Sequence, residues 1–290
     1  HQVLDWVSNE SPTLTNRVGD ARPELICTKR GQFGYVTVDW EYPLKEWTFH
    51  AVSGAVTSQK FGHGLGVGDV NGDGRLDIIH KDGWFAQPTS DKEAWKAHKF
   101  VFTPRGGAQM FAYDVDGDGG NDVITSVAAH EFGLAWFEQM MAGGDGGGIT
   151  FKKHLIMCST GRENKYCVVF SKLHATGLRD MDGDGLKDIV TGKTYWSHHK
   201  QSPQWNAGAV VYWFKLVRGK DGVECVTRRA DTLVGAGGEG SIGDVTGDGL
   251  PDFVSAGMKG THGLLHTVRK VGAAEYDKDQ PKPYSPRALP

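Results

Sequence analysis

The chain alternates between short apolar segments and turn-like clusters of glycine and acidic residues. Each of four apolar segments begins at the end of an acidic cluster and continues beyond it. These segments are LDIIH (76–80), NDVITSV (121–127), KDIVTG (187–192) and PDFVSAG (251–257). They are short and rich in β-branched residues, which is typical of β-strands rather than of helices. The pattern therefore predicts an all-β protein in which many short strands are joined by tight turns.

Four of the acidic clusters share one nine-residue pattern. They are DVNGDGRLD from Asp69, DVDGDGGND from Asp114, DMDGDGLKD from Asp180 and DVTGDGLPD from Asp244, and their first residues lie 45, 66 and 64 positions apart. A degraded fifth copy, NRVGDARPE, occupies residues 16–24. A unit that recurs roughly every 40–50 residues, lengthened in places by insertions, indicates a repeat architecture.

Each repeat contains four strand-like segments. A glycine-rich segment such as HGLGVGD (63–69) leads into the acidic cluster, and the apolar segment leads out of it. An aromatic segment such as GLAWFEQ (133–139) comes third, and a segment with the spacing aromatic-x-x-His, such as WKAHKF (95–100), comes fourth. Four strands per repeat predict the blades of a β-propeller.

The two ends of the chain indicate how the propeller would close. The last repeat stops after GLLHTVRKV (263–271) without a fourth strand, whereas the N-terminal HQVLDWVS (1–8) has the composition of one. We therefore predict five blades closed by the N-terminal strand, because closure leaves no open sheet edge. The propeller would form a single domain over residues 1–272, followed by a Pro-rich tail over residues 273–290.

With its lead-in FGHGLGVGDVNGDG (61–74), the acidic pattern resembles the FG-GAP/VCBS repeats of β-propellers. Over residues 9–268 the chain is similar to secreted FG-GAP repeat proteins of environmental bacteria, most of which have no assigned activity. In that family further blades usually precede this stretch and make seven, so the alternative is that the chain is part of a seven-bladed ring in a longer parent protein. Similar propellers occur in fungal lectins and integrin α-chains, and fungal aldos-2-ulose dehydratase has a metal-bearing propeller of broadly similar kind.

The acidic clusters offer the hard oxygen ligands that calcium prefers. Positions 1, 3, 5 and 9 would supply side-chain oxygens and position 7 a backbone carbonyl. An EF-hand is excluded because position 12 is not Glu and a β-like segment follows. We expect several calcium ions that stabilise the hairpins; Val18 removes a ligand from the degraded copy, where we expect no metal. The predicted ligands are Asp69, Asn71, Asp73, Arg75 and Asp77; Asp114, Asp116, Asp118, Gly120 and Asp122; Asp180, Asp182, Asp184, Leu186 and Asp188; and Asp244, Thr246, Asp248, Leu250 and Asp252.

The histidines fall into two groups by their position in the repeat. His50, His98 and His154 recur in the fourth strand, which indicates a structural role. A second group lies at the end of the first two strands that is opposite the acidic turns, and it provides the catalytic candidates His63, His130, His174 and His198. Neutral imidazoles that gather in this way suit a transition metal, so His63, His130 and His174 are predicted to bind one zinc, manganese or iron ion.

The same face carries residues suited to a carbohydrate, because exposed aromatic rings stack on sugars and basic groups hold anions. The predicted substrate-binding residues are Gln109, Lys193, Tyr195, Trp196, Glu239, Lys259 and His262. We expect a carbohydrate or another small-molecule ligand, and lyase or dehydratase chemistry if the protein is an enzyme. A non-catalytic carbohydrate- or protein-binding propeller, lectin-like or adhesive, is the alternative.

The composition of the chain excludes some classes of partner. Lys and Arg number 32 against 35 Asp and Glu, and the net charge of −3 gives a nucleic-acid partner no electrostatic support. No apolar run has the roughly 18–20 residues of a membrane helix. The FG-GAP resemblance implies a secreted, extracellular or periplasmic protein. Cys158 and Cys167 are spaced so that either a loop disulfide or two free thiols would fit.

Overall fold

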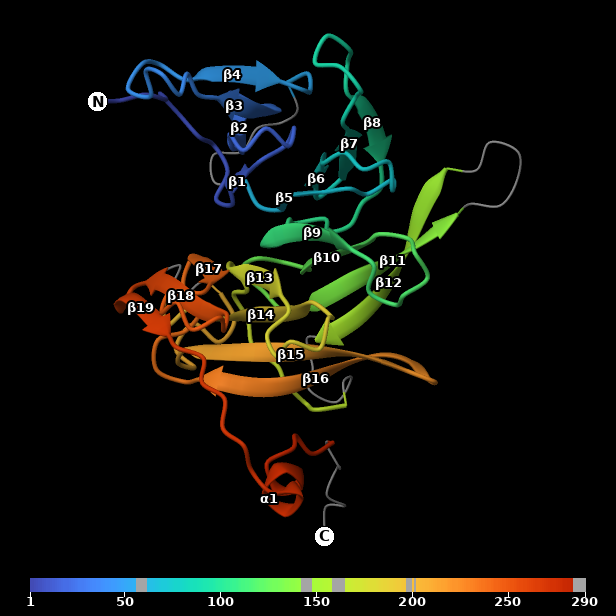
Figure 1. Cartoon of the computed structure of the whole chain (residues 1–290), viewed down its shortest axis with the longest axis vertical. Coiled ribbons are helices and arrows are strands. Elements are labelled where there is room, and N and C mark those ends of the chain that lie inside the picture. Colours follow the sequence, from blue (N-terminus) through green and yellow to red (C-terminus); the bar gives the residue numbers. More distant parts are fainter. Residues whose placement is uncertain (56–61, 142–147, 158–164, 197–199, 201, 284–290) are drawn as a thin grey trace. The chain divides into compact units, whose positions relative to one another are not determined.

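In the computed structural model, residues 1–55, 62–141, 148–157, 165–196, 200 and 202–283 are described, and their regular structure is almost all β-strand (Figure 1). The chain divides into two compact units. Unit 1 comprises His1–Ala128 and Trp136–His154, and unit 2 comprises Ala129–Ala135 and Leu155–Pro290. The all-β class predicted from the sequence is confirmed.

Unit 1 contains two sheets. The first has the order β1 (Thr13–Thr15), β2 (Glu24–Lys29), β3 (Gln32–Thr37) and β4 (Thr48–Ala51). The second has the order β12 (Ile149–Met157), β11 (Leu134–Met141), β10 (Asp122–Ser126), β9 (Gln109–Tyr113), β5 (Leu65–Gly68), β6 (Asp77–His80), β7 (Gly83–Ala86) and β8 (Lys96–Lys99), and only the ends of β11 and β12 belong to unit 2.

The eight-stranded sheet consists of two four-stranded repeats joined side by side. Their innermost strands, β5 and β9, pair in parallel with Leu65 opposite Gln109. The backbones come so close there that a Cβ at Gly66 would lie 1.8 Å from the carbonyl oxygen of Met110. Only glycine fits at this position, which explains the glycine-rich segments that precede the acidic loops.

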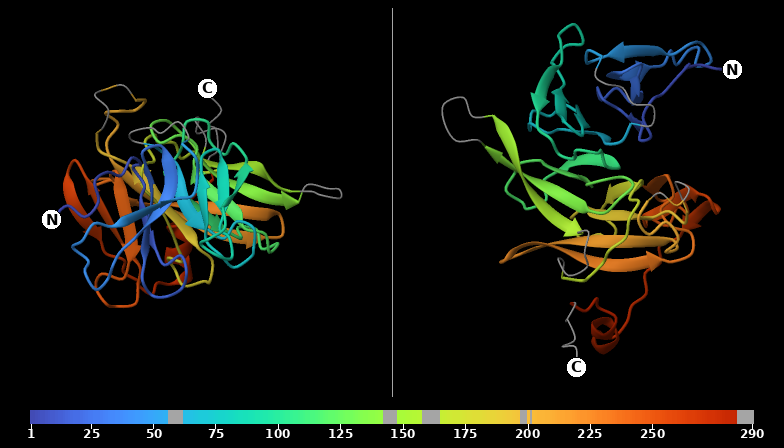
Figure 2. Two further views of the ribbon diagram at one scale, coloured as in Figure 1. Left: turned by 90° about the horizontal axis from the view of Figure 1, so that it is seen from above. Right: turned by 180° about the vertical axis from the view of Figure 1, so that it is seen from behind.

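Unit 2 repeats the same organisation. One sheet has the order β13 (Thr176–Arg179), β14 (Asp188–Lys193), β15 (Val210–Gly219) and β16 (Gly222–Asp231), and the other has the order β17 (Glu239–Gly243), β18 (Asp252–Gly257) and β19 (Gly260–Leu264). The long β15–β16 hairpin, drawn in orange, is visible in both views of Figure 2. A short helix, α1 (Ala273–Lys278), begins the segment that was predicted to be a tail.

The N-terminal segment differs from the prediction. Residues 1–8 form no strand, and the last sheet has three strands in the described part of the chain. The backbone of the segment bonds within unit 1 instead: the Val3 carbonyl accepts from the Trp47 N–H at 2.7 Å, and the Ser8 N–H donates to Thr28 at 2.8 Å. The prediction that this segment completes the last blade is therefore wrong. Closure of all sheets into a five-bladed ring stays a prediction.

The histidines of the fourth strands stack on aromatic rings of the third strands. His98 stacks on Trp84 with ring centroids 4.6 Å apart, and His154 stacks on Trp136 at 4.3 Å. In the first sheet His50 stacks on Tyr35 at 4.8 Å. The recurrent stacking gives the histidine of each fourth strand a structural role in packing, which the sequence had indicated.

One of the cysteines belongs to the apolar core. Cys27 is buried in β2, and burial raises the pKa of its thiol to about 11. A thiol with that pKa stays protonated and packs as a small apolar group. Cys158 lies outside the described residues, so the choice between a disulfide to Cys167 and free thiols stays open.

Candidate functional site

The first residue of each acidic loop holds the turn together. Its Oδ1 accepts a hydrogen bond from the backbone N–H of the glycine three residues later, at 2.6–2.8 Å in all four copies. The glycines at positions 4 and 6 have positive φ, as at Gly72 (75°) and Gly74 (83°). The loop conformation is therefore built into the chain by Asx turns and glycines.

The ninth residue of each loop has a role that the sequence did not reveal. Asp77, Asp122, Asp188 and Asp252 are each at most 1% exposed. In Asp122, Oδ2 accepts from the Val115 N–H at 2.9 Å and Oδ1 accepts from the Gln139 N–H at 2.7 Å. The carboxylate thus links its own loop to the third strand of the repeat through one hydrogen bond to each, an arrangement called the bracket below.

The same bracket recurs in the other three loops. The loop donors are Val70, Met181 and Val245, and the donors from the third strand or its continuation are Gln87, Leu216 and His266. Even the degraded copy keeps half of it, because Glu24 accepts from the Arg17 N–H at 2.9 Å. A signal for this role was present in the sequence: the acid at position 9 survives in the copy that has lost the carboxylates at positions 1 and 3.

The loop carboxylates also gather as a calcium site requires. One oxygen each from Asp114, Asp116 and Asp122 lie within 4.8 Å of one another. Asp180, Asp182 and Asp188 form an equivalent group. This spread matches two oxygens on opposite sides of one calcium ion at about 2.3–2.6 Å each, so the donor set fits calcium. The backbone carbonyls predicted at position 7 stay predictions.

Burial of the ninth carboxylate makes its ionisation costly. The pKa is raised to about 7 for Asp122 and to about 6 for Asp77 and Asp188, because burial removes water from the charged form. Neighbouring loop carboxylates, Asp116 and Asp118 for Asp122, add to the rise. At Asp252 the hydrogen bond from the His266 N–H lowers the pKa instead. In three loops the ionised form of the ninth carboxylate is therefore unfavourable, and a bound cation would stabilise it.

Two of the loops have a cationic side chain in contact with their carboxylates: Arg75 belongs to its loop, and Lys215 comes from strand β15. The Lys215 ammonium contacts Asp182 and lies 2.6 Å from the carboxylate of Asp184, and the Arg75 guanidinium contacts Asp73. These contacts lower the pKa of Asp184 and raise that of Lys215, although burial of Lys215 acts in the opposite direction. Lys215 therefore places a cation from β15 beside the carboxylates of the loop at residues 180–188.

Lys215→Met is expected to tighten calcium binding by the loop at residues 180–188 by about fivefold, because calcium would no longer compete with the ammonium. In calcium-free buffer the same variant should be slightly less stable than the parent. Calorimetric titration of the parent, of Lys215→Met and of the exposed control Lys153→Gln measures both effects. Equal calcium affinity in all three proteins would show that Lys215 does not compete.

Unit 2 contains a polar centre formed by His130, Lys172, His174 and Lys193. The Nε2 of His174 lies 3.1 Å from the Nδ1 of His130. Two nitrogen ligands of one tetrahedral metal ion, each at about 2.0–2.1 Å, would be about 3.3 Å apart. The pair therefore fits two ligands of a transition metal and equally fits a direct hydrogen bond between the rings.

Two lysines are buried beside this histidine pair. Lys172 is 0% exposed and Lys193 is 1% exposed. Thr176, two residues after His174, lies opposite Thr191, two residues before Lys193, where β13 pairs with β14. The backbone N–H of Lys172 donates to the carbonyl of Glu131, the neighbour of His130. All four residues therefore belong to one region of unit 2.

Burial changes the chemistry of both lysines. The pKa of Lys193 is lowered to about 8, mainly by burial and in addition by the charge of the nearby Lys172 ammonium. Burial also lowers the pKa of Lys172. The Lys193 ammonium donates to the Thr194 carbonyl at 3.0 Å, which uses one of its three N–H groups. A centre with two buried amines has the charge to hold an anion, and Lys172 was missed from the sequence because it lies outside the repeated pattern.

Several predicted substrate-binding residues lie in unit 2 as well. The Lys259 ammonium lies 4.1 Å from the centroid of the Tyr195 ring, and His262 contacts the Lys259 carbonyl at 2.9 Å. Tyr195 is 45% exposed, Trp196 is half-buried, and Glu239 is exposed at the start of β17. The structure thus brings Tyr195, Lys259 and His262 together at the surface of unit 2.

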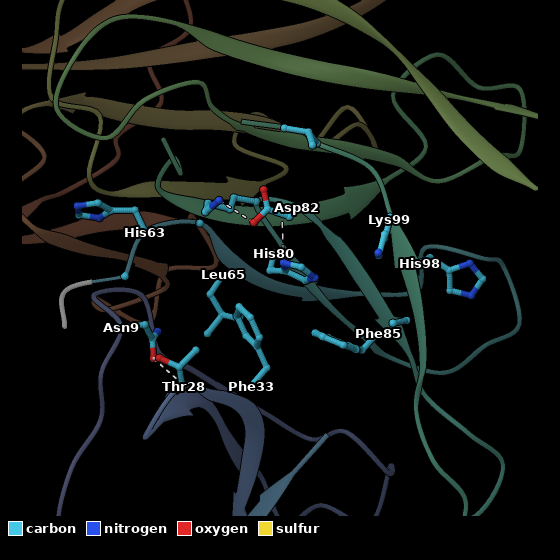
Figure 3. A pocket seen from close by; sticks show the side chains of 16 residues that line it. Asn9, Thr28, Phe33, His63, Leu65, His80, Asp82, Phe85, His98 and Lys99 are labelled. Carbon is cyan, nitrogen blue, oxygen red and sulfur yellow. Dashed lines mark hydrogen bonds and ion pairs between the residues drawn. The ribbon is translucent and has the colours of Figure 1, made fainter. Parts of the chain in front are cut away.

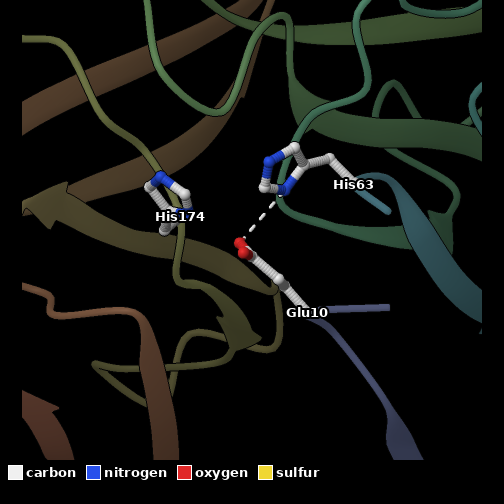
Figure 4. Close-up of side chains that lie close together, drawn as sticks. All are labelled: Glu10, His63 and His174. Atoms are coloured by element: carbon white, nitrogen blue, oxygen red, sulfur yellow. Dashed lines mark ion pairs between the residues drawn. The ribbon is translucent and has the colours of Figure 1, made fainter. Parts of the chain in front are cut away.

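The remaining candidates lie in unit 1 or outside the described residues. His63 forms an ion pair with Glu10, with Nδ1 3.3 Å from the carboxylate (Figure 4). Gln109 begins β9. His198 lies outside the described residues. A metal site made of His63, His130 and His174 would combine both units, and it stays a prediction.

Comparison with known proteins does not assign a family. No protein-family model and no curated protein match the chain. Among solved structures the chain is similar to the V. cholerae biofilm matrix protein Bap1, with 9% sequence identity, a TM-score of 0.32, and coverage of 85% of this chain and 66% of that one. That likeness is too weak to define a fold. In the described part of the chain, no helix is long and apolar enough to cross a membrane.

Proposed function

We propose that the protein is a secreted, calcium-stabilised β-propeller of the FG-GAP type whose polar centre acts on a carbohydrate that carries a carboxylate. The observation that carries the proposal is the burial of Lys172 and Lys193 beside the His130–His174 pair. Two desolvated amines favour a bound anion, because an opposite charge offsets the loss of water around them. The exposed Tyr195 ring nearby in sequence supports sugar stacking.

The residues of the polar centre suit a lyase. A lysine that neutralises the carboxylate of a uronate makes the proton on the adjacent carbon more acidic, and a neutral histidine can remove it. The electron pair then forms a carbon–carbon double bond as the neighbouring C–O bond breaks, and the leaving oxygen takes a proton from the second histidine or from Lys193. A zinc, manganese or iron ion held by His130 and His174 would supply Lewis-acid stabilisation of the same carboxylate.

The full chain, purified without added metals, should release an unsaturated product from a polyuronate such as polygalacturonate and none from neutral dextran. Ultraviolet absorbance of the new double bond follows the reaction. His174→Ala should lower the rate by about 100-fold or more, as expected for loss of an acid–base group. Lys153→Gln, an exposed lysine on β12, is the matched control for Lys193→Gln, which should weaken polyuronate binding.

The outcomes separate the classes of function. Saturable polyuronate binding without double-bond formation would favour a lectin-like protein. Absence of both binding and turnover would contradict the proposal. Metal analysis of the same preparation tests the metal independently, because a transition metal near one per chain that disappears in His174→Ala assigns it to this centre.

A further inference from the structure

A second candidate site lies within unit 1. A cavity of about 440 Å³ is lined by residues of β2, β3 and β5–β8 (Figure 3). Its lining is mostly apolar, with a small number of polar side chains. Cavities of roughly 300–1,000 Å³ with this kind of lining are typical of small-molecule sites.

Three aromatic rings in contact with one another form one part of the lining. The His80 ring lies 4.7 Å from the Phe33 ring and 5.0 Å from the Phe85 ring, with only 20° between the His80 and Phe85 planes. Leu65, which is 1% exposed, lies beside Phe33 in Figure 3. Flat rings at the edge of a cavity favour a flat apolar ligand, because aromatic groups pack best in offset or tilted stacks.

The lining also offers hydrogen-bond donors. The Asn9 Oδ1 accepts from the Thr28 N–H at 2.8 Å. This hydrogen bond fixes the orientation of the amide, and the Asn9 NH₂ group does not take part in it. That Nδ2 is buried and has no hydrogen-bond partner among the described residues. A buried donor without an acceptor is unfavourable, so a ligand that supplies an acceptor gains free energy here.

The His80 ring is a second hydrogen-bond donor, and its protonation state follows from its surroundings. Burial lowers its pKa to about 4, so the ring is neutral at pH 7. Its Nδ1 accepts from the Asp82 N–H at 3.3 Å, which leaves the proton on Nε2. The ring therefore combines an apolar face with one N–H donor.

The cavity has a cation at its edge. Lys99 is exposed at the end of β8 and lines the cavity, and no carboxylate lies within ion-pair distance of its ammonium in the described part of the chain. The neighbouring Lys81 differs, because its ammonium is already 2.6 Å from Asp82. Lys99 is therefore the group that would attract a negatively charged ligand.

We propose that this cavity binds a small aromatic carboxylate, with the aromatic ring against Phe33, His80 and Phe85 and the carboxylate toward Lys99. The cluster of rings at the cavity wall selects the flat apolar part of the ligand, and Lys99 selects its anionic end. The residues assigned to this ligand, Phe33, His80, Phe85 and Lys99, have no part in the proposed lyase activity, so the two proposals hold or fail separately.

Calorimetric titration of the full chain with benzoate, benzamide and cyclohexanecarboxylate tests the site. Benzoate should bind saturably at one site per chain, and the non-planar cyclohexanecarboxylate should bind more weakly. Lys99→Gln should weaken benzoate about tenfold, as expected for loss of a charge-assisted contact, and leave benzamide almost unchanged. Lys96→Gln, an exposed lysine on the same strand, should change neither ligand.

Filling the cavity provides a second test. Ala97 lines it from the exposed strand β8, so Ala97→Phe should abolish binding of both aromatic ligands while the unfolding temperature stays close to that of the parent. The proposal is overturned if the parent shows no saturable benzoate binding. It is also overturned if Lys96→Gln weakens benzoate as much as Lys99→Gln does, or if Ala97→Phe binds benzoate like the parent.

Discussion

Asp122→Ala is expected to destabilise unit 1 by about 2–6 kcal/mol in calcium-free buffer. The substitution removes both acceptors of the bracket, and the N–H groups of Val115 and Gln139 lose their partners. Each buried donor left without an acceptor costs about 1–3 kcal/mol. The sum is a large part of the ~5–15 kcal/mol that stabilises a typical domain. Chemical denaturation in the presence of a chelator measures the effect.

Asp116→Ala is the matched control for this prediction. Asp116 belongs to the same carboxylate group but does not bracket the loop to another strand. Its loss should remove the calcium ion of this loop and change the calcium-free stability by no more than about 0.5 kcal/mol. The bracket would be refuted as a major stabilising element if both variants unfolded at the same denaturant concentration in chelator.

Calcium removal is expected to lower the unfolding temperature more at pH 8 than at pH 5. The pKa of Asp122 is about 7 in the folded protein against its ordinary value of 3.8, and the pKa values of Asp77 and Asp188 are raised to about 6. Between these values the folded state keeps protons that the unfolded state has lost, so the calcium-free protein loses stability as pH rises from about 4 to about 7. Bound calcium offsets this loss because it neutralises the ionised carboxylates.

The size of the calcium effect follows from linkage. An ion present at about 100 times its dissociation constant stabilises the folded state by about 2.7 kcal/mol per site. Several such sites would raise the unfolding temperature by at least several degrees. Scanning calorimetry at both pH values, with calcium and with chelator, gives the four temperatures needed. An unchanged temperature on chelation at pH 8 would contradict the stabilising role of calcium.

The sequence by itself determined the repeated elements. Apolar runs beside glycine-rich acidic turns predicted the strands, and the four-strand organisation appears in β1–β4, β5–β8, β9–β12 and β13–β16. These features are local, because turn residues and alternating side chains act over a few positions of one hairpin. The grouping of the loop carboxylates was predictable for the same reason.

Tertiary structure decided where the unrepeated residues lie. The N-terminal segment has the composition of a strand, yet its backbone partners are Trp47 and Thr28. Which edge an isolated strand-like segment joins depends on the backbone groups that packing leaves open, and composition does not encode that choice. The same holds for Lys172, whose position beside Lys193 arises from the pairing of distant strands.

The role of the ninth acidic residue shows both contributions at once. Its recurrence in the sequence marked Asp122 as important, and calcium chemistry suggested a ligand. Only the folded chain shows that the carboxylate also receives an N–H from Gln139, 17 residues away. A buried carboxylate must satisfy its acceptors within the protein, and the donors that do so become known only when the third strand packs against the loop.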